Sequence, residues 1–158
     1  MIFKRILLYT VSFSLLNSGV VWANPLGGVV AAGQAEIAGQ GTGNVQINQA
    51  TDKTVINWNS FDIRQGETTE FKQPSANSVA LNRVTGSEQR ASEIAGNLIA
   101  NGKVVLVNPN GIFFDKTAKV DVAGLVASTA DITNENFMVG RGNFDIKNRL
   151  CCTNKQER

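Results

Sequence analysis

The chain has 158 residues, of which 15 are basic and 13 acidic; it has no histidine, and its net charge at neutral pH is +2. Without histidine, the sequence excludes Ser-His-Asp and Cys-His catalytic sites and lacks the most common metal ligand. The near-neutral charge argues against a nucleic-acid-binding protein, because such proteins carry a basic patch. We therefore expect no metal, no cofactor and no nucleic-acid partner.

The first segment has the three-part layout of a secretory signal peptide. Lys4 and Arg5 precede an apolar run over residues 6–21, and small residues follow at the −3 and −1 positions of a cleavage site. This layout predicts cleavage between Ala23 and Asn24. Cleavage removes two of the 15 basic residues and no acidic one, so the mature chain has a net charge of zero.

The alternative interpretation of the first segment is a membrane anchor. Residues 6–23 carry no charge, but serine, asparagine and glycine dilute their apolar character, and their length is at the bottom of the range for a span. The mature residues 24–158 suffice for one domain, with cysteines only at Cys151 and Cys152. Adjacent cysteines rarely pair with each other, so we expect the domain to be held by its core and its backbone hydrogen bonds.

Short apolar or alternating segments, separated by glycine, asparagine, aspartate and serine, predict an all-β chain. Val45 and Ile47 alternate with polar neighbours, and Val120 and Val122 repeat this pattern, so we expect these side chains to point inward. The window 88–94 is either a short helix or a polar loop with one helical turn. The expected strands cover residues 29–32, 36–38, 44–48, 54–58, 68–72, 78–82, 97–100, 104–107, 111–114, 119–122 and 125–128.

The second half of the chain is a loose series of similar units, "AGNLIANG", "KVVLVNPNG", "IFFDKTAKVDVAG" and "LVASTADITN". Each unit carries aliphatic residues and a corner rich in asparagine, aspartate or glycine. A β-sandwich usually has longer strands with cleaner alternation. Short strands with inward aliphatic residues and tight corners are typical of a parallel β-helix, in which successive coils stack on one another.

Several motifs in order make the chain resemble a known family. The segments "VINWNSFDIRQGETTEFKQPSANSVALNRVTG" and "IAGNLIANGKVVLVNPNGIFFDKTAKVDVAGLVAST" resemble the N-terminal secretion domain of filamentous-haemagglutinin-type exoproteins. These exoproteins are the secreted partners of bacterial two-partner secretion systems. The resemblance runs from about residue 29 to residue 140. Some family members carry an Asn-Pro-Asn-Leu motif that this chain lacks, so the chain is similar to the other subtype.

The resemblance implies a right-handed parallel β-helix with extra-helical hairpins and an N-terminal cap. It also implies a non-enzymatic role as the secretion-targeting domain of an adhesin or haemagglutinin-like exoprotein associated with virulence. An outer-membrane β-barrel transporter is expected to recognise the domain through its periplasmic domains. The exported domain is then expected to nucleate β-helix folding at the cell surface or in the medium of a Gram-negative bacterium, with host-cell binding left to regions beyond this chain.

The tetrapeptide Asn108-Pro109-Asn110-Gly111 is the most specific local motif. Pro109 fixes the φ angle wanted at the second position of a β-turn, Asn110 tolerates the left-handed region, and Asn108 can bond its own backbone two residues on. The flanking residues are β-branched and aromatic and predict strands. We interpret the tetrapeptide as a corner first and as a transporter contact second.

Four further residues are candidates for recognition or for the fold. Asn57, Asn59 and Asn82 are expected to be internal or corner amides that satisfy backbone groups, and direct transporter contacts are the alternative. Arg83 is the best candidate for a charged recognition residue. The alternative is that it is a solvated strand side chain with no role in recognition.

Two other functions stay open at this point. A β-helical polysaccharide-active enzyme needs paired carboxylates, for which Glu67 with Glu70 or Asp115 with Asp121 are candidates, although charged turns explain them as well. The tail over residues 141–158 leaves the β pattern and becomes charged. This change predicts a truncated or frameshifted reading frame, and in the extreme a fragment without function.

Overall fold

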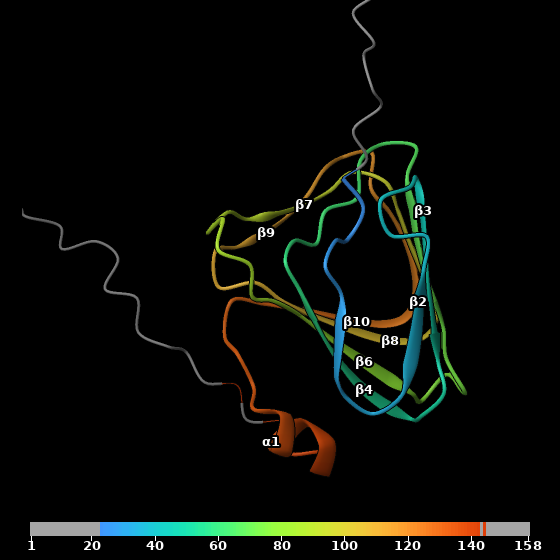
Figure 1. The fold of residues 1–158 in the computed structure, drawn as a ribbon, viewed down its shortest axis with the longest axis vertical. Coiled ribbons are helices and arrows are strands. Elements are labelled where there is room, and N and C mark those ends of the chain that lie inside the picture. Colours follow the sequence, from blue (N-terminus) through green and yellow to red (C-terminus); the bar gives the residue numbers. More distant parts are fainter. Residues whose placement is uncertain (1–22, 143, 145–158) are drawn as a thin grey trace, which may run out of the picture.

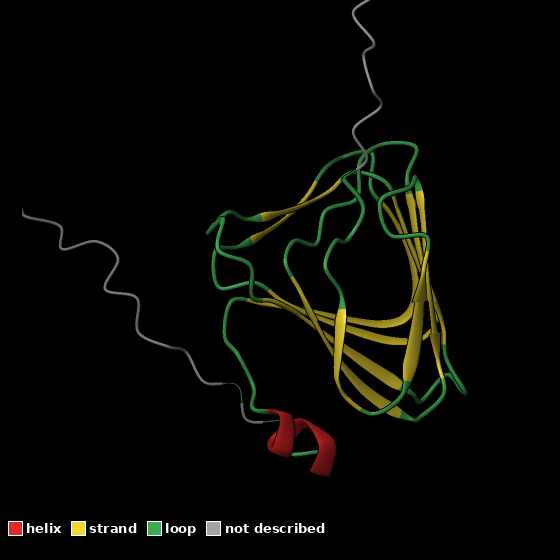
Figure 2. Ribbon diagram, viewed as in Figure 1, coloured by secondary structure: helices red, strands yellow, loops and turns green. Residues whose placement is uncertain are grey.

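The computed structural model of the protein describes residues 23–142 and residue 144, and most of this part is strand and turn. The strands line three sides of a solenoid that is roughly triangular in section (Figures 1 and 2). Each strand is short, but most strands pair with a strand of the coil before and a strand of the coil after. This stacking, rather than the length of any one pair, stabilises them.

The first face contains β3 (Asn44–Gln49), β5 (Thr68–Lys72) and the first halves of β8 (Asn97–Val107) and β10 (Lys119–Ser128). These strands pair in parallel in the order β3-β5-β8-β10. The number of residues between paired positions changes from coil to coil. The sequence therefore shows a loose series of units and no fixed period.

The second and third faces repeat this parallel stacking. The second contains β4 (Lys53–Trp58), β6 (Val79–Val84) and the second halves of β8 and β10. The third is shorter: β7 (Ser92–Ile94) pairs with β9 (Ile112–Phe114), and Ile63 forms a single parallel bridge to β7. One coil thus consists of one segment from each face, joined by corners.

An antiparallel cap closes the N-terminal end of the solenoid. β1 (Val29–Ala32) pairs with β4, β2 (Ala35–Ala38) pairs with β3, and Leu26 bridges to Ser60. These partners occupy strand edges of the first coil that would otherwise expose unpaired backbone groups. Within the described residues, antiparallel pairing is confined to this cap, so the hairpin of β2 and β3 belongs to it.

The interior of the coils holds one continuous apolar core. The rings of Trp58 and Phe61 meet edge to face, with centroids 5.7 Å apart and an interplanar angle of 84°. The indole N–H of Trp58 donates to Asn82 Oδ1 at 3.0 Å, which gives a buried donor its acceptor. The remaining buried members of this core are Val45, Ile47, Ile56, Ile63, Phe71, Ala80, Ile94, Leu98, Ala100, Val104 and Leu106.

A second apolar cluster covers the outside of the second face. Residues 131–139, here called the strap, include the short helix α1 (Asn134–Val139), which lies outside the coils in Figure 1. Ile132 and Phe137 of the strap pack on outward side chains of the strands, namely Val55, Leu81, Val105 and Val107. No helix in the described residues has the length and apolar character needed to cross a membrane.

Most expected strands occur within one or two residues of their expected bounds. Two pairs merge, because 97–100 and 104–107 are parts of β8, and 119–122 and 125–128 are parts of β10. The window 88–94 is not a helix: residues 88–91 are a loop, and residues 92–94 form β7. Neither β7 nor α1 was expected.

The inward direction of the alternating side chains is confirmed by burial and register. Val45 and Ile47 are fully buried. Val120 and Val122 pair with positions of β8 whose side chains lie in the core, so they point the same way. Val120 is nevertheless 40% exposed, because no described strand lies beyond β10.

Candidate functional site

The Asn108–Gly111 tetrapeptide forms the corner between β8 and β9. The Gly111 N–H donates to the Asn108 carbonyl at 3.0 Å, and the Asn110 N–H donates to Asn108 Oδ1 at 2.9 Å. These two bonds close a β-turn with an Asx turn inside it, as the composition predicts. The left-handed conformation falls on Gly111, with φ 111°, and not on Asn110.

The side chain of Asn108 also ties this corner to the preceding coil. It is 1% exposed, and its Nδ2 donates to the Arg90 carbonyl and to Ser92 Oγ, both at 3.0 Å. The Ser92 N–H in turn donates to the Gly111 carbonyl at 3.0 Å. Asn108 therefore links two successive corners as well as shaping its own turn.

The preceding corner is a charged loop over residues 85–91. Arg90 bridges Glu88, at 2.8 Å, and the buried Asp62, and these hydrogen bonds to Glu88 and Asp62 raise the pKa of the guanidinium. Asp62 Oδ1 also accepts the Glu93 N–H at 2.9 Å. Because of these bonds, one face of the loop is fixed while its outer face stays open to solvent.

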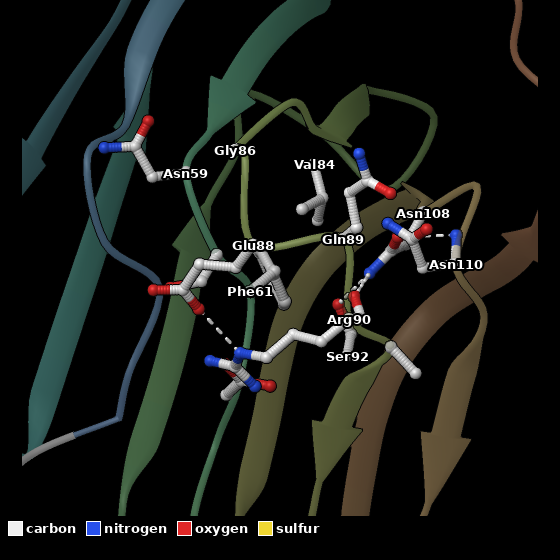
Figure 3. A pocket seen from close by; sticks show the side chains of 13 residues that line it. Asn59, Phe61, Val84, Gly86, Glu88, Gln89, Arg90, Ser92, Asn108 and Asn110 are labelled. Carbon is white, nitrogen blue, oxygen red and sulfur yellow. Dashed lines mark hydrogen bonds and ion pairs between the residues drawn. The ribbon is translucent and has the colours of Figure 1, made fainter.

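The two corners together form a surface patch, here called the corner patch. It contains Glu88, Gln89, Arg90 and Asn110, which line one pocket (Figure 3), and the exposed Pro109 next to Asn110 in sequence. Gln89 is the only non-glycine residue with positive φ in the part of the chain that the structure describes, at 47°. Such backbone strain persists only where surrounding contacts fix it, and it is frequent at functional sites. Sequence analysis missed the loop because its polar run was interpreted as a helix start or an ordinary loop.

The other candidate residues do not gather at one place. Asn82 is fully buried, accepts from Trp58 and donates to backbone carbonyls, as expected for an internal amide. Asn59 is exposed beside the corner patch and lines the same small pocket as Asn108 (Figure 3). Asn57 lies on the outer face of β4, next to the strap.

Arg83 is not a solvated side chain, because it clamps the strap to β6. The side chain is 12% exposed, and its Nε donates to Asp131 Oδ1 at 2.7 Å. One terminal nitrogen donates to Asn57 Oδ1 at 3.1 Å and to Asn134 Oδ1 at 3.0 Å, and the other donates to the Ile132 carbonyl. Its hydrogen-bonding capacity is used inside the domain, so the corner patch is the better candidate for recognition.

The carboxylates considered for an enzyme either have a structural role or lie elsewhere on the surface. Asp115 closes a turn by accepting from the Thr117 N–H and hydroxyl, and these bonds lower its pKa, whereas a general acid needs a raised pKa. Glu67 is buried, while Asp121 is exposed on the outer face of β10. The described residues contain no group of three or more histidine, cysteine or acidic side chains that could hold a metal ion.

The expected cleavage site lies at the first described residues. Asn24 is fully buried, its Nδ2 donates to the Thr42 carbonyl at 2.9 Å, and its Oδ1 accepts from Thr69 at 3.2 Å. The Ala23 N–H donates to the Glu67 carboxylate at 2.8 Å. Cys151 and Cys152 and most of the expected tail lie outside the described residues.

Comparison with known proteins gives consistent similarities. The family model of the TPS secretion domain matches residues 23–154. A heme/hemopexin-binding protein of Haemophilus influenzae (strain ATCC 51907 / DSM 11121 / KW20 / Rd) is 50% identical over 121 residues, which are 75% of this chain and 13% of that protein. A second heme/hemopexin-binding protein of Haemophilus influenzae is 50% identical over 86 residues, or 54% of this chain and 9% of that protein.

A solved structure is also similar. The crystal structure of the HMW1 secretion domain from Haemophilus influenzae matches with a TM-score of 0.68 and 38% identity, over 74% of this chain and 30% of that one. This match confirms the predicted all-β fold class, a parallel β-helix. The chain spans only 13% of the length of the first curated relative. From the family model, the relatives and the fold together, the chain belongs to the TPS secretion domain family and serves as a secretion-targeting domain of the kind that two-partner secretion exoproteins carry.

Proposed function

We propose that the periplasmic domains of an outer-membrane β-barrel transporter recognise this domain, and that its open end then nucleates the β-helix of the exoprotein that follows. A secretory signal, cut between Ala23 and Asn24, would bring the chain to the periplasm, and the product would reach the cell surface or the medium. The support is the family membership together with one feature of the fold, the open C-terminal end of the solenoid.

The open end is the observation that carries the proposal. On its inner edge β10 pairs with β8 along both halves, and no described strand occupies its outer edge. Val120 and Leu125 point toward the core but are 40% and 36% exposed, whereas Leu98, one coil earlier, is fully buried. An open strand edge beside uncovered apolar side chains is a template for a further strand.

Such an edge suits both steps of the proposed function. A strand of the transporter's periplasmic domains can add to the edge during recognition, with backbone hydrogen bonds giving affinity. The next coil of the exoprotein can replace that strand outside the cell, and it then buries the same side chains. The corner patch supplies charge at one side of the solenoid and would add specificity to the first step.

Binding of the mature chain to the transporter tests the recognition step. Residues 24–158, first shown by circular dichroism to melt cooperatively with a β spectrum, are titrated calorimetrically with the purified periplasmic domains of the cognate transporter. We expect Leu125→Lys at the open end to weaken binding by roughly tenfold. Lys72→Ala, an exposed change on β5, is the control and leaves binding unchanged. A folded chain that does not bind would refute the proposal.

Host recognition is assigned to the exoprotein beyond this domain. The relatives named as heme/hemopexin-binding proteins are far longer than this chain, which covers 13% and 9% of them. A secretion-targeting domain shared with such proteins needs no ligand of its own. We therefore propose no heme, host-surface or polysaccharide site on the described residues, and a non-enzymatic role.

A further inference from the structure

A buried carboxylate lies beside the expected cleavage site. Glu67 is 2% exposed, and its two oxygens accept from the Ala23 N–H and the Arg64 N–H, both at 2.8 Å. A carboxylate buried this far is costly unless it is hydrogen-bonded or paired with a positive charge. One of these two hydrogen bonds comes from Ala23, the residue that signal cleavage removes.

Asn24, the first residue of the mature chain, is held in place next to this carboxylate. Its side chain bonds the Thr42 carbonyl in the turn before β3 and Thr69 in β5, and it is fully buried. Glu67 directly precedes β5. The nitrogen of Asn24 follows that of Ala23 by one residue, a step of about 3.8 Å between Cα atoms. The anchored side chain therefore holds position 24 one residue from the nitrogen that bonds the carboxylate.

We propose that Glu67 is the receptor for the α-ammonium group that signal cleavage creates on Asn24. Hydrolysis of the Ala23–Asn24 peptide bond consumes one water, leaves a carboxylate on Ala23 and gives Asn24 an amine that is largely protonated at neutral pH. The lost Ala23 N–H is replaced by a charged donor one residue on. An N⁺–H···O⁻ bond is stronger than the amide–carboxylate bond it replaces.

The acidic groups around this position outnumber the basic ones. A cleft of about 290 Å³ beside Ala23 is lined by Asp62, Arg64, Arg90 and Glu93, and Arg90 is also bonded to Glu88. Glu67 adds a further negative charge to this surplus. A new positive charge at Asn24 is therefore electrostatically favoured.

The inference rests on the proposed signal cleavage and adds a consequence to it. Asn24 bonds both the turn before β3 and β5, so the ion pair would fasten the cap to the second coil. A chain that still carries its leader has only the neutral amide at this place. The cap would thus reach its full stability only after the leader is removed, which couples maturation to folding.

A double-mutant cycle on the mature chain tests the ion pair. Residues 24–158, freed from a tag cut directly before Asn24, and the Glu67→Gln variant are each compared by urea denaturation with the same protein acetylated at its α-amino group. We expect acetylation to raise the unfolding equilibrium constant roughly tenfold in the unsubstituted chain and less than about twofold in E67Q. Glu36→Gln, at an exposed position of β2, is the matched control and keeps the full effect of acetylation. Equal effects of acetylation with and without Glu67→Gln would overturn the inference.

A second measurement does not depend on the folding of a variant. The α-amine of the native mature chain should react with an acylating reagent about tenfold more slowly than the amine of an unstructured peptide with the same first residues. Equal rates, or an exported protein whose mass shows a first residue other than Asn24, would overturn the proposal. Neither experiment includes the transporter, so a failure here and a failure of transporter binding are separate results.

Discussion

Asn108 is the residue on which two corners of the solenoid depend. Its Oδ1 shapes the turn by accepting from Asn110, while its Nδ2 donates to Arg90 and Ser92 in the coil before. Serine or threonine has a hydroxyl acceptor for the turn, but it carries one O–H donor and lacks the two N–H donors of an amide. An asparagine at this position therefore has a physical reason that does not involve the transporter.

Asn108→Ala should destabilise the domain by about 2 kcal/mol, because it leaves the part-buried Arg90 carbonyl and the buried Ser92 hydroxyl without this donor. Asn108→Asp should cost more, since it keeps the turn acceptor but points a carboxylate at the Arg90 carbonyl. Urea denaturation measures both, with the exposed Lys72→Ala on β5 as control. A change at Asn108 that abolished transporter binding without loss of stability would show a direct contact instead.

The Asp115 carboxylate predicts a dependence of stability on pH. Hydrogen bonds from Thr117 lower the pKa of Asp115 from 3.8 in the folded chain. Its stabilising effect is therefore complete above the unfolded pKa and is lost as the pH falls below 3.8 through the lowered value. The loss of stability caused by Asp115→Asn should be present at pH 7 and shrink at acidic pH. Asp121→Asn, on the exposed face of β10, is the control, and urea midpoints across the pH range decide the matter.

At the scale of elements, the strap makes the second face different from the first. Inward side chains of β4, β6 and β8 join the coil core, while outward Val55, Leu81 and Val105 lie under the strap. Arg83 holds one end of the strap, and Lys53 holds the other by donating to the carbonyls that end α1. A six-residue helix is not stable alone, so these contacts must maintain it.

Arg83→Lys should loosen the strap. Lysine keeps the positive charge but lacks the planar set of donors that reaches Asp131, Asn134 and the Ile132 carbonyl together. We expect a loss of about 1–2 kcal/mol. We also expect faster hydrogen exchange over residues 131–139, measured by mass spectrometry. The exposed Arg141→Lys should change neither quantity, and unchanged exchange in Arg83→Lys would contradict the clamp.

Elements with a local signal could be predicted from the sequence, and elements held by distant contacts could not. The turn at Asn108 and the alternation in β3 follow from residue types within a few positions. α1 could not be predicted, because its anchors on Arg83 and Lys53 are remote in sequence. β7 was missed because three residues carry little pattern and depend on pairing with β9.

Prediction of the corners and of the site from the sequence has the same limit, because both depend on contacts between residues distant in sequence. Gly102 lies between two expected strands, 97–100 and 104–107, yet β8 continues through it. A Cβ at this position would lie 2.6 Å from Gln73 Oε1. The glycine thus serves close packing at a bend rather than the end of a strand. The role of Arg90 at the corner patch also depends on Asp62, which lies on the preceding coil. Nothing in the sequence predicted that Arg90 or Asp62 would lie near Asn108.

The molecule as a whole has two unlike ends. Antiparallel strands close the N-terminal end, while no strand in the described residues covers the outer edge of β10, beside which Val120, Leu125 and Val126 are exposed. A closed end with paired strand edges resists association, whereas an open edge with apolar side chains promotes it. This asymmetry agrees with the proposed nucleating role.

The open edge of β10 predicts self-association of the polypeptide 24–158. Residues 24–158 should sediment as a concentration-dependent mixture, because open edges of two copies can pair. Val126→Lys, on the outer face of β10, should shift the mixture toward monomer without lowering thermal stability. Val29→Lys, at a more exposed position that lies in the cap, is the control and should leave the mixture as it was. Association weakened equally by both substitutions would place the contact elsewhere.

Because the cap closes one end, coils can be added to the solenoid only at the other end. The number of coils is therefore not fixed by this domain. Because only one end accepts another rung, material can be added to the molecule lengthwise and in one order, from the amino terminus onward. Each added coil packs on an open strand edge and exposes a similar open edge to the next coil. The same capped domain can therefore precede a short or a long β-helix. Evolution can lengthen or exchange that β-helix while the sequence of the capped domain stays the same.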